Sequence, residues 1–333
     1  MLPITRQTKT SVERTTGFSL IEFMVGMAIG AVLILFSLVV YRQNLSDYQK
    51  QEQSVEMMEN VRAALYFMQE DIEMAGFFGP ITDPSVIDDS DVNLTIVQDC
   101  GPATAPDTWA LHDRTPFSYL LPTSAAAANA AFPCISSADF QTNNPVLAIK
   151  RVASTSSATC TLHNTCLRAR SASGELFRQT ATTPAPAAGE TIWPYIVNVY
   201  YIRNYDTTSG DNIPSLYRTT LQVAADNTTN MVTETGGIGE NIEFFRLMFG
   251  IDSDTDGFAN YFTSDPTGQY ANIAAVRVYF LVRSSNTFSS VTNDKTYTLG
   301  DYSYTATGDG YLRRVFTTTI HARNIINTRE LSE

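Results

Sequence analysis

One uncharged stretch of 19 residues decides the architecture of this chain: FMVGMAIGAVLILFSLVVY, from Phe23 to Tyr41. A helix rises about 1.5 Å per residue, so a segment of this length nearly crosses a hydrocarbon core of about 30 Å. The residues before it include three cations and one acid: Arg6, Lys9, Arg14 and Glu13. The positive-inside rule therefore predicts a cytoplasmic amino terminus, a single membrane span, and a remainder that lies across the membrane.

The apolar segment is expected to stay in the mature protein. A secretory signal has an apolar run of about 7 to 15 residues, followed by a small-x-small cleavage site. This run is longer, and the sequence that ends it, LFSLVVYRQ at 35–43, contains no such site. The segment is thus better interpreted as an anchor than as a removable signal.

The composition argues against a general nucleic-acid binder. The chain has 333 residues, 34 of them acidic and 22 basic, and a net charge of −12, whereas contacts to a phosphate backbone need a basic surface. Its length allows a sizeable core. Four arginines gather near the carboxy terminus: Arg313, Arg314, Arg323 and Arg329. We expect them to pair with carboxylates of this chain or of a partner rather than with DNA.

Glu22 is the residue that a plain anchor does not explain, because it lies directly before the uncharged run. A carboxylate inside a membrane costs about 2.5 to 3.5 kcal/mol on insertion scales. One explanation is a capping box, Ser19-x-x-Glu22, with the acid in the first helical turn. Another is cleavage after Gly17, which would create an α-amine at Phe18 that could neutralise Glu22 within one chain or between chains.

The segment Gly17-Phe18-Ser19-Leu20-Ile21-Glu22 resembles the processing site of type IV prepilins. In that family a short basic leader ends in Gly, the mature chain begins with Phe, and Glu is its fifth residue. The resemblance implies that a prepilin peptidase cuts after Gly17 and that the new amine of Phe18 is methylated. It also implies that Glu22 pairs with the amine of a neighbouring subunit during filament assembly.

Further segments resemble the PilW group of minor pilins: 71–79 (DIEMAGFFG), 242–251 with the Asp-rich loop that follows, 275–284 (AVRVYFLVRS) and 313–316 (RRVF). The resemblance implies a minor pilin that takes part in initiating type IV pilus assembly within a tip complex, and that is found in the pilus (fimbrium) after assembly. Implied partners are other minor pilins, the major pilin, the prepilin peptidase and, as a further candidate, a tip adhesin. Twitching motility, adhesion and DNA uptake are all open as filament functions.

Two alternatives remain. A type II secretion pseudopilin shares the amino-terminal motif. An ordinary signal anchor carrying a periplasmic enzyme or calcium-binding module is the alternative from another class.

The helix is expected to continue beyond the membrane as far as Ala75, because the chain after Tyr41 contains no Gly before Gly76 and no Pro before Pro80. Seven apolar residues follow with helical spacing: Val55, Met58, Val61, Leu65, Met68, Ile72 and Ala75. This stripe predicts a helix face that packs on a domain.

The second half of the chain is rich in Val, Ile, Tyr, Phe and Thr, which favour strands. We predict strands at Val146–Val152, Ile192–Ile202, Leu216–Val223, Ile242–Ile251, Ile273–Val282 and Leu312–Ile320. The expected fold is α+β and type IV pilin-like, with the long helix packed on an antiparallel sheet. The predicted parts are a leader (1–17), an assembly helix (18–41), its amphipathic continuation (42–76) and a periplasmic β-rich domain (77–333).

Residues 77–144 are interpreted as an irregular, surface-exposed insertion with short strands at best. The segment contains seven prolines between Pro80 and Pro133 and the alanine tract Ala125–Ala131.

The four cysteines, Cys100, Cys134, Cys160 and Cys166, all follow the apolar segment. The periplasm oxidises thiols, so an even count predicts two disulfides. Three connectivities are possible, and Cys100–Cys134 with Cys160–Cys166 joins sequence neighbours. The competing interpretation is zinc at Cys160-x-x-His163-x-x-Cys166, which lacks an evident fourth ligand.

An acidic motif is the candidate metal site. Asp252, Asp254 and Asp256 precede Gly257 with the spacing of the first half of a calcium loop. The match fails at position 12, which is Thr263 instead of Glu, and position 9 is Asn260. Asp265 or the carbonyl of Phe258 could substitute. The alternative interpretation is an acidic β-turn without metal.

No catalytic motif is found. His112, His163 and His321 lie outside any nucleophile pattern, and GxSxG, HExxH and P-loop sequences do not occur. We therefore expect no enzymatic activity and no certain cofactor.

Overall fold

The computed structural model of the chain describes residues 17, 19–101, 109–112, 115–170 and 173–325. It contains two compact units, Met1–Glu52 and Gln53–Glu333, and helix α1 (Leu20–Glu73) begins in the first and ends in the second. The predicted boundaries after residues 41 and 76 stay predictions. The division falls at Gln53 because the helix packs into the core of the second unit from this residue onward.

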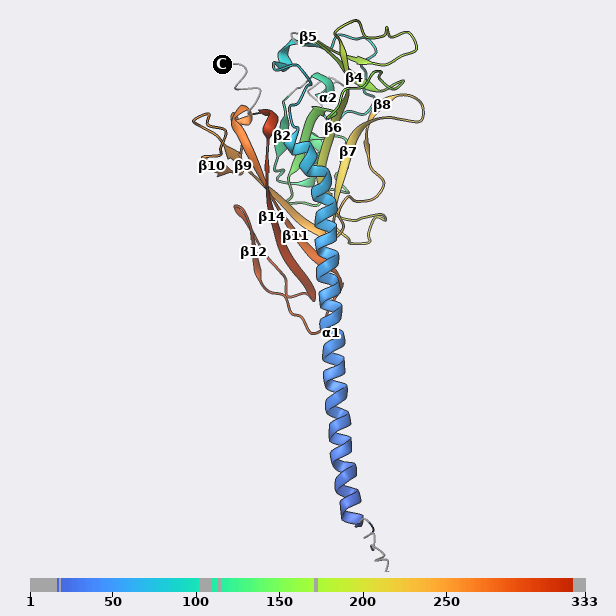
Figure 1. Cartoon of the computed structure of the whole chain (residues 1–333), viewed down its shortest axis with the longest axis vertical. Helices are drawn as coiled ribbons and strands as arrows, with labels where there is room; N and C mark the ends of the chain where they lie inside the picture. Colours follow the sequence, from blue (N-terminus) through green and yellow to red (C-terminus); the bar gives the residue numbers. More distant parts are fainter. Residues whose placement is uncertain (1–16, 18, 102–108, 113–114, 171–172, 326–333) are drawn as a thin grey trace, which may run out of the picture. The chain divides into compact units, whose positions relative to one another are not determined.

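The described strands form two larger sheets and a hairpin (Figure 1). The eight-stranded sheet comprises β1 (Ile87–Asp88), β2 (Phe117–Leu120), β3 (Val146–Val152), β4 (Thr165–Arg170), β5 (Ser173–Arg178), β6 (Thr191–Arg203), β7 (Ser215–Val223) and β8 (Thr229–Thr233). The four-stranded sheet has the order β10 (Tyr261–Thr263), β9 (Ile242–Ile251), β11 (Ile273–Thr287), β14 (Tyr311–His321). The hairpin is β12 (Thr296–Leu299) with β13 (Tyr302–Thr305).

This architecture confirms the predicted fold class, a long helix on antiparallel sheet. All six predicted strands are present, and the bounds of β3 and β9 are those predicted. The β1–β5 pair is parallel, whereas the other described strand pairs are antiparallel. The prediction of one sheet was too simple, because the strands divide between two sheets that share a core with α1.

The interpretation of 77–144 as a surface insertion was wrong. This segment supplies apolar side chains that are buried against the face of the eight-stranded sheet turned away from α1, among them Phe78, Ile81, Ile96, Ile135 and Phe140. Its elements also include the helices η1 (Pro84–Val86), α2 (Trp109–His112) and α3 (Ala125–Ala131); the remaining described helix is η2 (Tyr270–Asn272).

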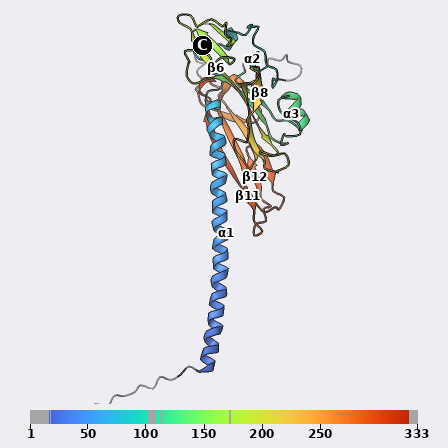
Figure 2. The same ribbon diagram turned by 90° about the vertical axis from the view of Figure 1, so that its right-hand side faces the viewer.

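The alanine tract is helical rather than irregular. Alanine has the highest helix propensity, and the hydroxyl of Ser124 caps α3 by accepting a hydrogen bond from the Ala127 N–H at 3.1 Å. Figure 2 shows α3 set apart from α1, on the other side of the sheets.

The buried face of α1 contains Val61, Met68 and Ile72 as predicted, but before Val61 it is shifted from the predicted stripe. Its buried residues are Gln53, Met57, Val61, Ala64, Met68, Asp71 and Ile72. Val55 is 58% exposed and Met58 is 37% exposed, so both were wrongly placed in the core. The shift arises because two polar residues, Gln53 and Asp71, lie on the inner face, where an apolar pattern cannot reveal them.

The helix ends as the sequence indicates, within a turn of Gly76. Regular α-helix stops at Glu73, and Gly76 adopts φ +73°, a left-handed conformation that glycine tolerates. Its N–H then donates to the carbonyl of Lys150 at 3.0 Å, which ties the end of the helix to β3.

Asp71 fixes the last turn of α1 on the eight-stranded sheet. Its buried carboxylate accepts hydrogen bonds from Arg151 Nε at 2.8 Å, from Asn198 Nδ2 at 2.6 Å, and from the hydroxyl of Tyr200. Arg151 comes from β3, and the other two donors come from β6. Burial and the charge of Asp71 raise the pKa of Tyr200, so its hydroxyl keeps the proton that it donates.

Asp71→Ala is expected to lower the free energy of unfolding by about 3–5 kcal/mol, because Arg151, whose side chain is 7% exposed, would remain buried without its partner. Guanidinium unfolding of the full chain in detergent, followed by the fluorescence of Trp109 and Trp193, measures this loss. Glu70→Ala is the matched control. Its carboxylate lies 3.4 Å from Arg151 but is 55% exposed, so less than about 1 kcal/mol should be lost. Equal losses in the two variants would contradict the role of Asp71.

Candidate assembly site

The candidate assembly site begins at the first described residues of the chain. Gly17 is exposed, and Leu20 starts α1. Phe18 and residues 1–16 lie outside the described part, so the predicted cleavage and methylation at Gly17 and Phe18 stay predictions.

Glu22 lies in the first turn of α1. Its Oε2 accepts a hydrogen bond from the backbone N–H of Ser19 at 2.9 Å, which is one half of a capping box. The positive end of the helix dipole also favours a carboxylate at this position. These contacts leave an exposed carboxylate at the start of an apolar surface.

The surface that follows Glu22 is apolar and uncovered. From Leu20 to Tyr41 every side chain is exposed, apart from glycine, which has none. Within the described residues, α1 is the helix long and apolar enough to cross a membrane, and its best 18-residue window has a mean hydropathy of 2.7 with no residue buried. The one hydroxyl in the middle, that of Ser37, donates to the carbonyl of Leu33 at 2.8 Å, so it needs no water.

An exposed apolar surface of this length needs either lipid or other helices to cover it. It offers no polar side chain after Glu22 other than Ser37 until Tyr41. The arrangement can therefore anchor the chain and pack against like helices, with Glu22 as the single charge available for pairing.

The acidic motif forms a tight turn after β9. Ligand oxygens of Asp252, Asp254 and Asp256 all lie within 4.8 Å of one another. Asp252 is buried, and its two oxygens accept the N–H groups of Thr255 at 2.8 Å and Gly257 at 2.9 Å. Gly257 adopts φ +86°, which is the reason that the turn needs glycine there. Three carboxylates this close repel one another, which favours a cation.

Asn260, at position 9 of the motif, and Asp265, one of the two substitute ligands considered from the sequence, have partners of their own. The side-chain oxygen of Asn260 accepts the N–H of Ser253 at 2.6 Å, and Asp265 accepts the N–H of Thr267 at 3.0 Å. Calcium binding therefore stays a prediction that rests on the three carboxylates.

The cysteines form the disulfides Cys100–Cys134 and Cys160–Cys166, the connectivity that joins sequence neighbours. Because the sulfur atoms of Cys160 and Cys166 are bonded to each other, the zinc interpretation of this loop was wrong. His163 lies within the loop at φ +70°, and His112 and His321 lie on α2 and β14.

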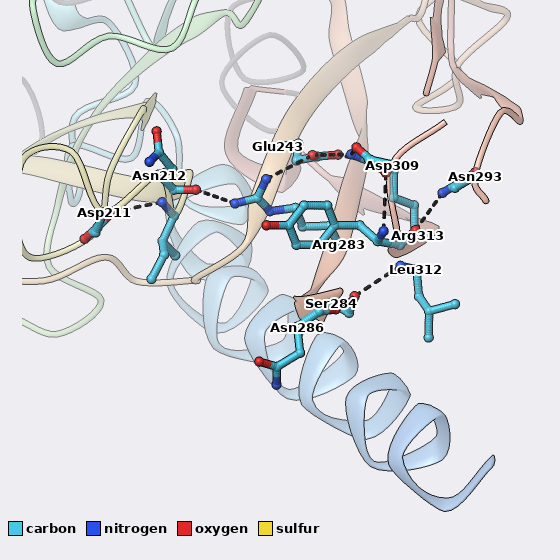
Figure 3. Close-up of polar contacts among 12 residues, drawn as sticks. Asp211, Asn212, Glu243, Arg283, Ser284, Asn286, Asn293, Asp309, Leu312 and Arg313 are labelled. Atoms are coloured by element: carbon cyan, nitrogen blue, oxygen red, sulfur yellow. Dashed lines mark hydrogen bonds and ion pairs between the residues drawn. The ribbon is translucent and has the colours of Figure 1, made fainter. Parts of the chain in front are cut away.

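Sequence reasoning missed a cluster of arginines and acids that gathers residues of β9, β11 and β14 with Asp309 (Figure 3). Arg313 makes bidentate contacts with Glu243 (2.6 and 2.8 Å) and with Asp309 (2.6 and 2.8 Å). Arg283, opposite Arg313 on β11, lies 3.7 Å from Glu243 and donates to the carbonyl of Asn212. Burial opposes the charge of Arg313, but the bonds to Asp309 and Glu243 raise its pKa overall.

The expectation that the carboxy-terminal arginines pair with carboxylates of the chain therefore holds for Arg313. Arg314 and Arg323 are exposed, and Arg329 lies outside the described residues. No sequence signal could place Glu243 beside Arg313, because 70 residues separate them.

Comparison with known proteins gives two matches along the sequence. The family model described as Type IV Pilus-assembly protein W matches residues 199–324, which run from β6 to the end of β14 and just beyond. The model described as Prokaryotic N-terminal methylation motif matches residues 14–38. No curated protein matches the chain.

Among solved structures, the chain is similar to the type IV-like pilin TTHA1219 from Thermus thermophilus. The sequence identity is 10%, the TM-score is 0.33, and the match covers 80% of this chain and 96% of that one.

The methylation motif covers Gly17, Glu22 and the start of the apolar surface, and the PilW match covers the four-stranded sheet with its hairpin. The chain is thus similar to the type IV pilus-assembly protein W family over residues 199–324, and it matches the prokaryotic N-terminal methylation motif over residues 14–38.

Proposed function

We propose that this chain is a minor pilin that takes part in initiating type IV pilus assembly within a complex at the filament tip. The observation that carries the proposal is the single helix α1, Leu20–Glu73. Its first part presents an uncovered apolar surface, and its last part is built into the core of the domain that contains the PilW match. One continuous helix thus contributes residues both to the apolar surface and to the core of the folded domain.

The proposed maturation begins in the inner membrane. A prepilin peptidase cuts after Gly17, the amine of Phe18 is methylated, and the domain lies in the periplasm. The two disulfides support this placement, because the periplasm oxidises thiols. The chain leaves the membrane for the pilus when its apolar helix exchanges lipid for the helices of other pilins.

The tip position is supported by the size of the folded unit. Gln53–Glu333 makes up most of the chain, and a bulky domain is difficult to repeat closely along a thin filament. The proposed partners are the other minor pilins and the major pilin, with a tip adhesin as a further candidate. The PilW match favours a pilus over a secretion pseudopilus.

Glu22 is proposed to select the neighbour. In lipid its charge costs about 2.5 to 3.5 kcal/mol, and a methylated amine at Phe18 of an adjoining subunit would offset that cost. Apolar packing alone would allow helices to slide past one another. A single buried ion pair fixes the axial register between neighbours.

Mass spectrometry of the chain extracted from membranes is expected to find methylated Phe18 as the amino terminus. Met1, or the product of its ordinary trimming, would show instead that the segment is a signal anchor. That result would favour an anchored periplasmic protein over a pilin.

Glu22→Ala is expected to leave cleavage largely intact and to reduce incorporation into filaments by roughly tenfold or more, which corresponds to about 1.4 kcal/mol. Immunoblots of sheared filaments and of membranes measure the two quantities. Glu52→Ala, at an exposed acid of the same helix, should change neither. Normal incorporation of the Glu22 variant would refute the pairing.

Calcium binding at the acidic turn is a separate prediction. Titration calorimetry of the full chain in detergent should show Ca²⁺ binding with a Kd of about 10⁻⁴–10⁻³ M, the range of extracellular modules. Asp254→Ala should abolish it. Asp226→Ala is the control, since Asp226 caps a different turn by accepting the N–H of Thr228 at 3.0 Å. An absence of heat at millimolar Ca²⁺ would leave a metal-free turn.

A further inference from the structure

The four-stranded sheet ends in a long strand with an open edge. The strand order is β10, β9, β11, β14, and β14 pairs with β11 along one side. In the described part of the chain no strand pairs with its other side. At eleven residues, β14 is also the longest edge strand of the two larger sheets.

The hydrogen bonds identify which backbone groups face the open side. His321 on β14 lies opposite Ala275 on β11, so the next pair along the two strands is Ala322 and Ala274. The Ala322 N–H donates to the carbonyl of Ala274, so this is a hydrogen-bonded pair. Bonded pairs alternate with non-bonded pairs in an antiparallel ladder. Even-numbered residues of β14 therefore bond to β11, and the N–H and C=O groups of Arg313, Val315, Thr317, Thr319 and His321 point outward.

The start of the open edge is fixed by its neighbours. The carbonyl of Tyr311, which also points outward, accepts the side-chain amide of Asn293 at 2.9 Å. The Leu312 N–H donates to Ser284 Oγ at 3.1 Å, and the Arg313 side chain is held by Glu243 and Asp309 (Figure 3). The edge from Arg313 to His321 is thus presented by a strand that is held in place.

Three of the usual protections of an edge, namely proline, lysine and a bulge, are missing from this segment. Residues 313–321 contain no Pro and no Lys, and their register with β11 is continuous, without a bulge. Thr317, Thr319 and His321 are exposed. Nine residues in register are enough for a strand of ordinary length to pair with them.

Other edges of the two sheets are short or covered. β10 has three residues, β2 has four and β1 has two. The edge of β8 is occupied by residues 96–98, since the Val97 N–H donates to the Thr229 carbonyl and the Met231 N–H donates to the Gln98 carbonyl. Among the described strands, β14 is therefore a long edge strand whose outer side is unpaired.

The charge along β14 indicates the chemistry of what would pair with it. No acid occurs between residues 310 and 329, in a chain with 34 acidic residues. Arg314 and Arg323 are exposed in this stretch. A second copy of β14 would bring the same cations together, whereas an acidic strand would complement them.

We propose that the open edge of β14, Arg313–His321, pairs with an extended, acid-bearing strand of another assembly subunit, so that the partner adds a fifth strand to the sheet. Backbone hydrogen bonds to the outward groups give the affinity, and a carboxylate beside Arg314 sets the register. The proposal rests on the proposed assembly function, which supplies the neighbouring subunit.

Site-specific photocrosslinking in cells tests the pairing with the full chain in its own membrane. A photoactivatable phenylalanine analogue replaces Thr317 or Thr319, and the linked residues are identified by mass spectrometry. Strand pairing predicts links to one acidic segment of another subunit, shifted by two residues when the probe moves by two. The same probe at Thr296 or Thr298, which are exposed on β12, is the control and should not link to that segment.

Two substitutions separate backbone pairing from general contact. With the probe at Thr319, Thr317→Pro removes one outward N–H and should lower the yield roughly fivefold or more, whereas Thr317→Val keeps the N–H and should not. Arg314→Glu should lower the yield, and Arg314→Lys should preserve it. Thermal unfolding of each variant verifies the fold.

The outcomes are distinct from those that test the proposed function. Links only to a second copy of this chain, links without the two-residue shift, or no links from a chain with methylated Phe18 that enters filaments would overturn the edge proposal alone. An unprocessed Phe18 would overturn the assembly function itself.

Discussion

The structure depends on a buried carboxylate, Asp71, at the end of the long helix. Its bonds to Arg151, Asn198 and Tyr200 connect the last turn of α1 to two strands of the eight-stranded sheet. A buried ion pair adds little net stability compared with apolar packing, but removing either partner is costly. It therefore specifies one docking position for the helix. Apolar contacts alone would permit the helix to slide along the sheet, and the polar contacts of Asp71 oppose this.

Much of the architecture could be predicted from the sequence because its signals are local. The uncharged run from Phe23 to Tyr41 determines the character of the first half of α1, and the β-branched runs that became β3 and β9 have the predicted bounds. The side of α1 that packs against the domain could be predicted less well. Apolar periodicity identified Met58 where Met57 is buried, and it could not identify Asp71, whose burial is explained by distant partners, Arg151, Asn198 and Tyr200.

The proline-rich segment shows where local reasoning ends. Prolines and short runs between Phe77 and Asn144 resemble a loop, and yet Phe78, Ile135 and Phe140 fill one face of the eight-stranded sheet. Elements this short are stabilised by the sheet they cover rather than by their own propensity. The apolar first half of α1 and Glu22 could be predicted from the sequence, since Glu22 belongs to a recognisable motif and the uncharged run follows it directly. The arginine cluster and the open edge of β14 depend on register between distant strands and could not be predicted.

The register of β11 and β14 brings two arginines together, and nearby acids offset their repulsion. Arg283 and Arg313 stand directly opposite each other on β11 and β14, where like charges destabilise a pair of strands. Glu243 on β9 bonds to Arg313 and lies close to Arg283, and Asp309 bonds to Arg313 from the other side. The hydrogen bond from Arg313 lowers the pKa of Asp309, so the acid stays charged beside it. An edge that were merely unprotected would fray at its first residues, and this cluster holds those residues in strand geometry. The charges of Arg313, Glu243 and Asp309 thus keep the open edge of β14 ordered. An ordered open edge is the arrangement expected of a surface that pairs with a partner strand.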